Sequence, residues 1–152
     1  MTIEARLKEL GLELPAPAVP VRAYVAAVRS GQLLFTAGQL PTRDGKLIAA
    51  GKIPTEVSLE QAQAAARQAA LNALSAAKSV LGSLDKVARI VRVNVFVNSA
   101  ADFTDQAKVA NGASELLVEV FGDAGRHTRC AIGAAQLPLN AAVEVDLVLE
   151  TA

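Results

Sequence analysis

The sequence predicts an α+β protein in which a mixed β-sheet is covered on one face by two helices. Two segments, the alanine-rich residues 59–81 and residues 104–121, repeat their apolar positions with the period of a helix. Other segments alternate with the period of a strand, and the order along the chain is β-β-(β)-α-β-α-β-β. A sheet with both helices on one face is the economical architecture for this order. We expect one domain over residues 1–152, in which residues 1–18 form an N-terminal helix and a proline-rich connector.

Short elements are expected in the first third of the chain. A helix over residues 3–10 precedes the sequence LPAPAVP, whose prolines favour an extended connector. The segments VRAYVAAV and LLFTAGQL are separated by RSGQ, which predicts an antiparallel hairpin. Asp44-Gly45 indicates a second tight turn.

The two helices have recognisable ends. Ser58 and Gln61 match a capping box at the start of the helix over 59–81, and a glycine follows each helix. The stripe along the first helix is made of small residues, which suits a helix that lies flat on a sheet. It consists of Ala62, Ala66, Ala69, Ala73, Ala77 and Val80.

The long strands carry the clearest alternation. In the last strand, AAVEVDLVLET, one face is wholly apolar and is expected to meet the helices. Its other face carries Glu144, Asp146, Val148 and Glu150. In VARIVRVNVFVNS, strict alternation places Ile90 and Phe96 on that second face as well. Acids beside apolar residues are not typical of a solvated face, so we expect this mixed face to be enclosed by another subunit.

Composition limits the classes of function. Fifteen basic and fifteen acidic residues give no net charge, which disfavours nucleic-acid binding through a broad basic surface. A single cysteine excludes an intrachain disulfide and fits the cytoplasm. The N-terminal sequence lacks the apolar core of a signal peptide, and no run reaches the roughly 18 apolar residues of a membrane span. Much of the apolar content is alanine, which buries little area per side chain. Contacts between subunits could supply the missing buried area, so this composition favours oligomerisation.

Three side chains are candidates for chemistry. Arg129 begins a strand of small residues and can bind a carboxylate through paired hydrogen bonds; the alternative is a surface arginine at a strand end. Glu144 can hold or activate a water if half-buried, or can pair with a cation of another subunit. Tyr24, the only tyrosine, can close a pocket or serve as an amphipathic packing residue.

Other chemistry is disfavoured around Arg129. His127 shares a strand face with Arg129 and is expected to be a polar strand-entry residue near the site. Cys130 points the other way and is expected to be buried as a small apolar residue, which disfavours a Cys/His nucleophile pair. One histidine and one cysteine do not make a metal site, so no metal is expected. There is no phosphate-binding glycine motif.

Three segments in this order resemble the RidA/YjgF/L-PSP family. They are AYVAAVRSGQLLFTAGQLP, LGSLDKVARIVRVNVFVNSAADF and GRHTRCAIGAAQLPLNAAVEVDLVLE. The resemblance covers residues 19–150, and the N-terminal helix and the GRHTR sequence are closer to a longer, less characterised branch. The departures from the best-known branch are Cys130-Ala131, where Ser and then Cys or Thr are usual, and Gly133, where a larger residue is common.

The resemblance implies a chorismate-mutase-like fold, a homotrimer and ligand sites between subunits. It also implies hydrolysis of reactive enamines and imines, such as 2-aminoacrylate, to 2-keto acids and ammonia without a cofactor. By position, Arg129 would bind the substrate carboxylate and Glu144 would position the water. Tyr24 would line the wall, Gly38 would allow close backbone approach, and Asn111 would face the site from the second helix.

Two other functions are kept as alternatives. A trimer could bind a small carboxylate metabolite in the same cleft without turnover, as the departures beside Arg129 allow. An endoribonuclease, a label often attached to the family, is disfavoured by the absence of net positive charge, the few aromatic residues and the single histidine.

Overall fold

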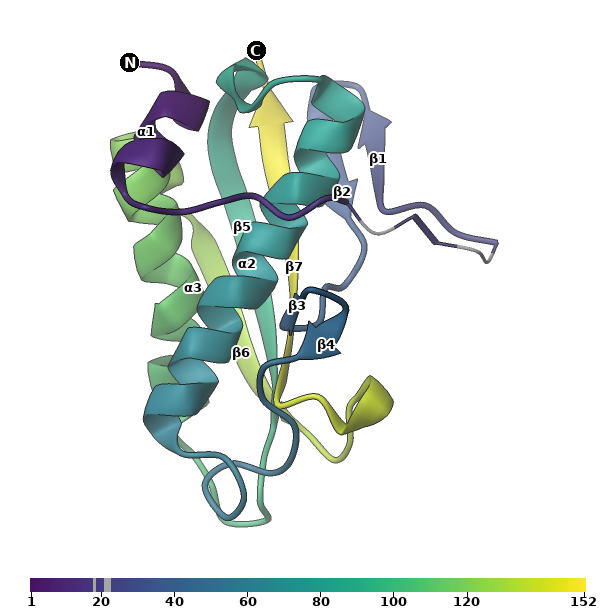
Figure 1. Ribbon diagram of the computed structural model, residues 1–152, viewed down its shortest axis with the longest axis vertical. Coiled ribbons are helices and arrows are strands. Elements are labelled where there is room, and N and C mark those ends of the chain that lie inside the picture. Colours follow the sequence, from purple (N-terminus) through teal and green to yellow (C-terminus); the bar gives the residue numbers. More distant parts are fainter. Residues whose placement is uncertain (18, 21–22) are drawn as a thin grey trace.

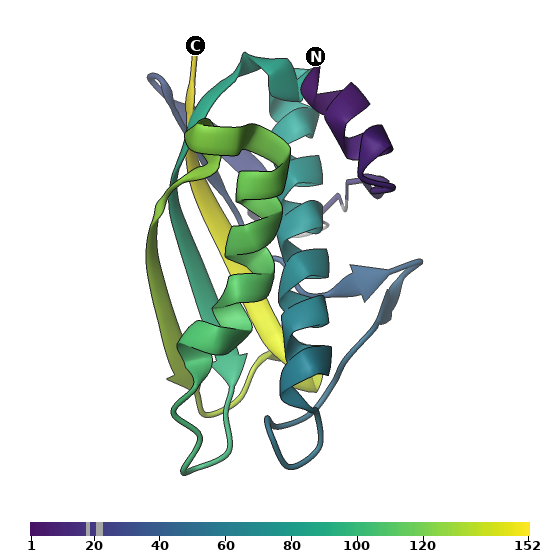
Figure 2. The same ribbon diagram turned by 90° about the vertical axis from the view of Figure 1, so that its left-hand side faces the viewer.

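The computed structural model describes residues 1–17, 19–20 and 23–152 and has the expected α+β architecture (Figures 1 and 2). The helices are α1 (Ile3–Glu9), α2 (Leu59–Leu81) and α3 (Gln106–Phe121). The strands are β1 (Ala27–Ser30), β2 (Leu33–Thr36), β3 (Thr42–Arg43), β4 (Lys46–Leu47), β5 (Val87–Asn98), β6 (Thr128–Ala134) and β7 (Val143–Thr151). Three single turns of 3₁₀ helix, at 84–86, 122–125 and 138–140, connect them.

The main sheet has the strand order β1-β2-β7-β5-β6, and β3 and β4 form a separate small hairpin. Only the β5–β6 pair is parallel among the described strands, and α3 makes the crossover between those two strands. Figure 2 shows α2 and α3 side by side on one face of the sheet, as predicted. The predicted hairpin is confirmed as β1–β2, although it is shorter than expected. Residue 18 of the predicted connector and residues 21 and 22 of the predicted first strand lie outside the described residues.

Helix α2 begins as predicted, is buried along most of its small stripe and lies close to α3. The capping box is confirmed, since Gln61 N donates to Ser58 Oγ and Ser58 N donates to Gln61 Oε1, at 3.1 and 2.9 Å. The alanines of the stripe are fully buried, whereas Val80, predicted to belong to it, is 45% exposed. At the contact with α3, a Cβ added to Gly112 would lie only 2.0 Å from the carbonyl oxygen of Gln63.

β7 confirms the predicted division into two faces. Val143, Val145, Leu147 and Leu149 are buried beneath the helices, and the residues between them are half-buried on the other face. In β5 the prediction was wrong for Ile90, which is fully buried with Val93, Val95 and Val97. Irregularities in the β5–β7 register near Ile90 and Arg92 interrupt the alternation and turn Ile90 to the helix-covered face.

The second face of the sheet, called the open face below, is not covered by any described helix (Figure 2). It exposes apolar side chains as well as acids: Val28, Leu33, Phe35 and Ile132 are 38–53% exposed. At the other side of the molecule α1 packs against α3, where Arg6 Nε donates to the carbonyl of Glu119 at 3.0 Å (Figure 1). Among the described helices, none has the length and apolarity that crossing a membrane would require.

Candidate functional site

Arg129 lies in a polar cluster between β6 and α3. Its Nη1 donates to Asn111 Oδ1 at 2.8 Å and to Ser114 Oγ at 3.2 Å. Asn111 and Ser114 are three residues apart on α3 and therefore share one face of that helix. Arg129 is largely exposed, and these two contacts fix the direction of its guanidinium group.

His127 completes this cluster and fixes the proton positions in it. Its Nδ1 lies 2.6 Å from the carbonyl oxygen of Gly125, which can only accept, so Nδ1 carries a hydrogen. In the neutral ring Nε2 is then an acceptor for the hydroxyl of Ser114, at 2.8 Å. The hydroxyl oxygen of Ser114 remains free to accept from Arg129. Burial lowers the pKa of His127, the hydrogen bond to Gly125 opposes this, and the charge of Arg129 lowers it further, which favours the neutral ring.

Glu144 lies in a second cluster, near the start of β7 and beside the chain that follows β2. Burial raises the pKa of its carboxyl group, and the nearby charge of Asp146 raises it further. Asp146 itself accepts a hydrogen bond from Asn94 Nδ2 at 2.8 Å. Gly38 lies directly against the carboxylate, because a Cβ added there would be 2.3 Å from Glu144 Oε2. The absence of a side chain at this position therefore makes room for Glu144.

Arg129 and Glu144 lie on opposite faces of the sheet. Arg129 is paired in register with Val93, which is fully buried on the helix-covered face. Glu144 is paired with Phe96 on the open face. Residues paired across neighbouring strands point to the same face, so a single chain cannot bring both side chains to one small molecule. We call Asn111, Ser114, His127 and Arg129 the arginine half-site, and Gly38, Glu144 and Asp146 the carboxylate half-site.

Residues 4–151 match the family model described as "YjgF/chorismate mutase-like, putative endoribonuclease". The chain belongs to the YjgF family. It is 49% identical to Protein TCP17 of Trypanosoma cruzi over 97% of this chain and 93% of that protein.

Two crystal structures of relatives match almost the whole YjgF fold of this chain. One is Atu1372 of Agrobacterium tumefaciens, of unknown function, with 44% identity and a TM-score of 0.92 over 99% of this chain and 92% of that one. The other is a "putative endoribonuclease" of Shewanella oneidensis, with 36% identity and a TM-score of 0.95 over 99% of both chains. E. coli TdcF, solved with bound serine, shares the fold at 22% identity, with a TM-score of 0.66 over 92% of this chain and 96% of that one.

The structure brings the predicted YjgF site residues together in two groups rather than one. Arg129, Asn111 and His127 are joined by hydrogen bonds through Ser114, and Gly38 adjoins Glu144. Tyr24 precedes β1, is 59% exposed and is not part of either half-site in the described contacts.

The prediction that Cys130 is buried was wrong. The cysteine does point away from Arg129, but it is exposed, because β6 pairs it with Asn94 on the open face, where no described helix covers the sheet. Ser114 was missed at the level of the sequence. Its position three residues after Asn111, on the same face of the predicted helix, is a signal that could have identified it.

Among the described residues, no three His, Cys, Asp or Glu side chains come together in a group that could hold a metal ion. The arginine half-site presents a guanidinium group held in a fixed direction, and the carboxylate half-site presents a carboxyl group whose pKa is raised.

Proposed function

We propose that this chain is a cofactor-free enamine/imine deaminase whose active site forms between two copies of the chain. The observation that carries the proposal is the placement of Arg129 and Glu144 on opposite faces of one sheet, each supported by polar neighbours. Membership of the YjgF family supports the same chemistry. The substrates are 2-imino acids and their enamine tautomers, and the products are 2-keto acids and ammonia.

The arginine half-site binds the substrate carboxylate. Among the described residues only Nη1 of Arg129 has hydrogen-bond partners, which leaves Nε and Nη2 for a bidentate contact with a carboxylate. Asn111 and Ser114 hold the guanidinium group before the substrate arrives, so less conformational entropy is lost on binding. His127 keeps the hydroxyl hydrogen of Ser114 turned away from Arg129.

The carboxylate half-site handles the protons. Water attacks the imine carbon and forms the C–O bond while Glu144 accepts one of its protons. Glu144 then returns this proton to the nitrogen, the C–N bond breaks with its electron pair on nitrogen, and the hydroxyl proton leaves with the ammonia. One water is consumed and one ammonia released, with no change in oxidation state. The raised pKa of Glu144 lies closer to neutral pH than that of an ordinary carboxyl group. A carboxyl group with such a pKa both accepts and donates protons efficiently.

Assembly completes the site. The open face exposes Val28, Phe35 and Ile132 beside the half-buried acids, as expected of a surface that another subunit covers. A closed ring with head-to-tail contacts brings the β6–α3 edge of one copy to the open face of the next, and we propose the homotrimer implied by the family. We place this reaction in the cytoplasm.

Turnover is the direct test of this proposal. An amino-acid oxidase would generate imines in situ, and the release of 2-keto acid would be followed with and without the protein. We expect acceleration over buffer for wild type and a loss of about 10²- to 10⁴-fold for Glu144→Gln, as for other general acid–base groups. No acceleration with any imino acid, or an Arg129→Ala variant equal to wild type, would reject the deaminase.

A second candidate function is binding of a small carboxylate without turnover. It is favoured by β6, where the residues that follow Arg129 on the same face are Ala131 and Gly133, which offer no side-chain hydrogen bond. Calorimetry with 2-keto acids distinguishes the two: saturable binding without any turnover supports this alternative. RNA cleavage is the weaker third candidate, since the arginine half-site contains one imidazole and no second base.

A further inference from the structure

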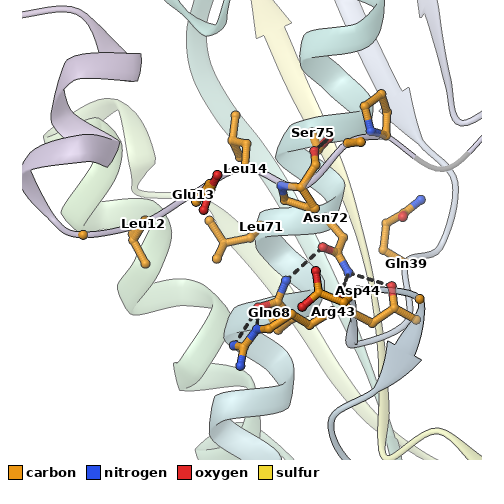
Figure 3. A pocket seen from close by; sticks show the side chains of 16 residues that line it. Leu12, Glu13, Leu14, Gln39, Arg43, Asp44, Gln68, Leu71, Asn72 and Ser75 are labelled. Atoms are coloured by element: carbon orange, nitrogen blue, oxygen red, sulfur yellow. Dashed lines mark hydrogen bonds between the residues drawn. The ribbon is translucent and has the colours of Figure 1, made fainter.

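A cavity of about 720 Å³ lies on the far side of α2 from α3, away from both half-sites. Its walls are the connector formed by Gly11 to Pro17, the β3–β4 hairpin and α2 (Figure 3). This volume is within the range of cavities that bind small molecules. Gln39 lines it from the chain between β2 and β3.

A row of buried polar side chains forms the floor of this cavity. Gln68, Asn72 and Ser75 lie at successive turns of α2 and are only 4–7% exposed. Buried amides are costly unless they are hydrogen-bonded, and here Gln68 Nε2 donates to Asn72 Oδ1 at 3.1 Å. Asn72 Nδ2 donates to the carbonyls of Leu40 and Thr42, at 2.9 and 3.0 Å. Ser75 Oγ donates to the carbonyl of Pro15, at 2.5 Å.

This row fixes a guanidinium group at one end of the cavity. Nε and Nη2 of Arg43 both donate to Gln68 Oε1, at 3.2 and 2.9 Å (Figure 3). Gln68 is neutral, and no carboxylate lies within 4.0 Å of Arg43 among the described residues. The positive charge is therefore oriented without being neutralised, and Nη1 remains free for an anion.

The cavity also contains negative charge and an apolar wall. Asp44 lines it from the hairpin turn and Glu13 from the connector, and neither is in an ion pair with a described residue. Leu71 on α2 and Leu14 on the connector are apolar lining residues (Figure 3). One cation, two carboxylates and an aliphatic wall in one cavity match a ligand that carries both charges and a hydrocarbon group.

We propose that this cavity binds a free α-amino acid with an aliphatic side chain. Its carboxylate contacts Arg43, its ammonium group lies between Asp44 and Glu13, and its side chain packs against Leu71 and Leu14. The site is independent of the deaminase proposal, because it shares no residue with either half-site. Gln39 is its nearest link to the first site, since the backbone of Gln39 is bridged to Val145, the neighbour of Glu144.

The test is titration calorimetry of the full chain with three matched probes: L-leucine, its 2-keto acid and isoamylamine. The latter two keep the carbon skeleton but lack the ammonium and the carboxylate group, respectively. We expect L-leucine to bind once per chain with a Kd of roughly 0.1–1 mM. The comparison of the three probes is made on the full-length Arg129→Gln variant, because Arg129 of the first site can itself bind the carboxylate of the 2-keto acid. On this variant we expect each of the other two probes to bind at least about tenfold more weakly than L-leucine.

Four variants locate the site. Arg43→Gln and Asp44→Asn should each weaken leucine binding by about tenfold or more, since each removes one charged contact. Asp44 has φ 53°, a conformation that asparagine tolerates, so Asp44→Asn should keep the turn. If Arg43→Gln does not fold, leucine binding by Asp44→Asn tests whether the cavity is the binding site. Lys46→Gln makes the same charge change as Arg43→Gln on the same hairpin but outside the cavity, and should bind like wild type. Arg129→Gln should also bind like wild type.

Other results overturn the proposal. Absence of heat at about 20 mM L-leucine, well above the expected Kd, would show that the cavity binds no such ligand. If the Arg129→Gln variant bound the 2-keto acid or the amine as tightly as L-leucine, the cavity would be a site for a single charge. Loss of binding in Arg129→Gln, with Arg43→Gln unaffected, would place leucine in the deaminase cleft instead.

Discussion

Gly38→Ala is expected to lower activity by about 10²-fold while leaving the fold intact. The added methyl group would lie 2.3 Å from Glu144 Oε2 and 2.9 Å from Glu144 Cδ. Since ordinary non-bonded contacts are about 3.5 Å, the carboxylate oxygen must move by roughly 1 Å. A displacement of this size at a reacting group costs about 10²-fold in rate, or about 2.7 kcal/mol of transition-state stabilisation. Gly38 does not have a positive φ, so alanine introduces no backbone strain, and the free energy of unfolding should change by less than about 1 kcal/mol.

The assay is kcat/KM for imine hydrolysis together with thermal unfolding, measured on Gly38→Ala, Glu144→Gln and the double variant. If Gly38 acts through Glu144, the double variant should be no slower than Glu144→Gln alone, because the two changes remove the same contribution. Full activity in Gly38→Ala, or additive losses in the double variant, would refute this account of the carboxylate half-site.

Three further predictions concern stability. Gly112→Ala should destabilise the fold by about 2 kcal/mol, because the methyl group meets the rigid backbone of Gln63, and the better helix propensity of alanine offsets only about 1 kcal/mol; chemical denaturation measures it. The raised pKa of Glu144 means that its contribution to stability is full below its ordinary pKa of 4.5 and is lost as the pH rises through the folded-state pKa. Thermal melts should therefore show Glu144→Gln to be more stable than wild type near pH 7, with the difference vanishing in acid. The pKa of His127 is lowered, so wild type should lose stability as the pH falls through 6.5 towards the folded-state pKa, and His127→Gln should show a weaker decline in melts over the same range.

Much of the fold could be predicted because local signals agree with the tertiary structure. The capping box and the terminal glycine of α2 are local features, and they define the observed helix, Leu59–Leu81. The alternation in β7 likewise survives in the structure, where its apolar residues are all buried. Ile90 could not be placed correctly, because the register irregularity that turns it inward depends on pairing with β7, which no local pattern of β5 encodes.

The residues of the candidate site could be selected from the sequence, but their arrangement in space could not be predicted from it. Arg129 and Glu144 could be selected from the sequence, yet their opposite orientations follow from the register of three strands. Cys130 was assigned to the interior because alternation reports which face a residue occupies and not whether that face is covered. The cavity near Arg43 depends on contacts between the connector, a hairpin and α2, which are distant in the sequence.

The composite nature of the active site is tested most directly by mixing two inactive variants. Arg129→Ala and Glu144→Gln would be unfolded together, refolded as an equal mixture and assayed for imine hydrolysis, with each variant refolded alone as a control. Because each cleft takes its arginine and its carboxylate from different copies, about a quarter of the clefts should contain both residues, and about a quarter of wild-type activity should return. A mixture that forms mixed oligomers but stays as inactive as its components would contradict the shared site.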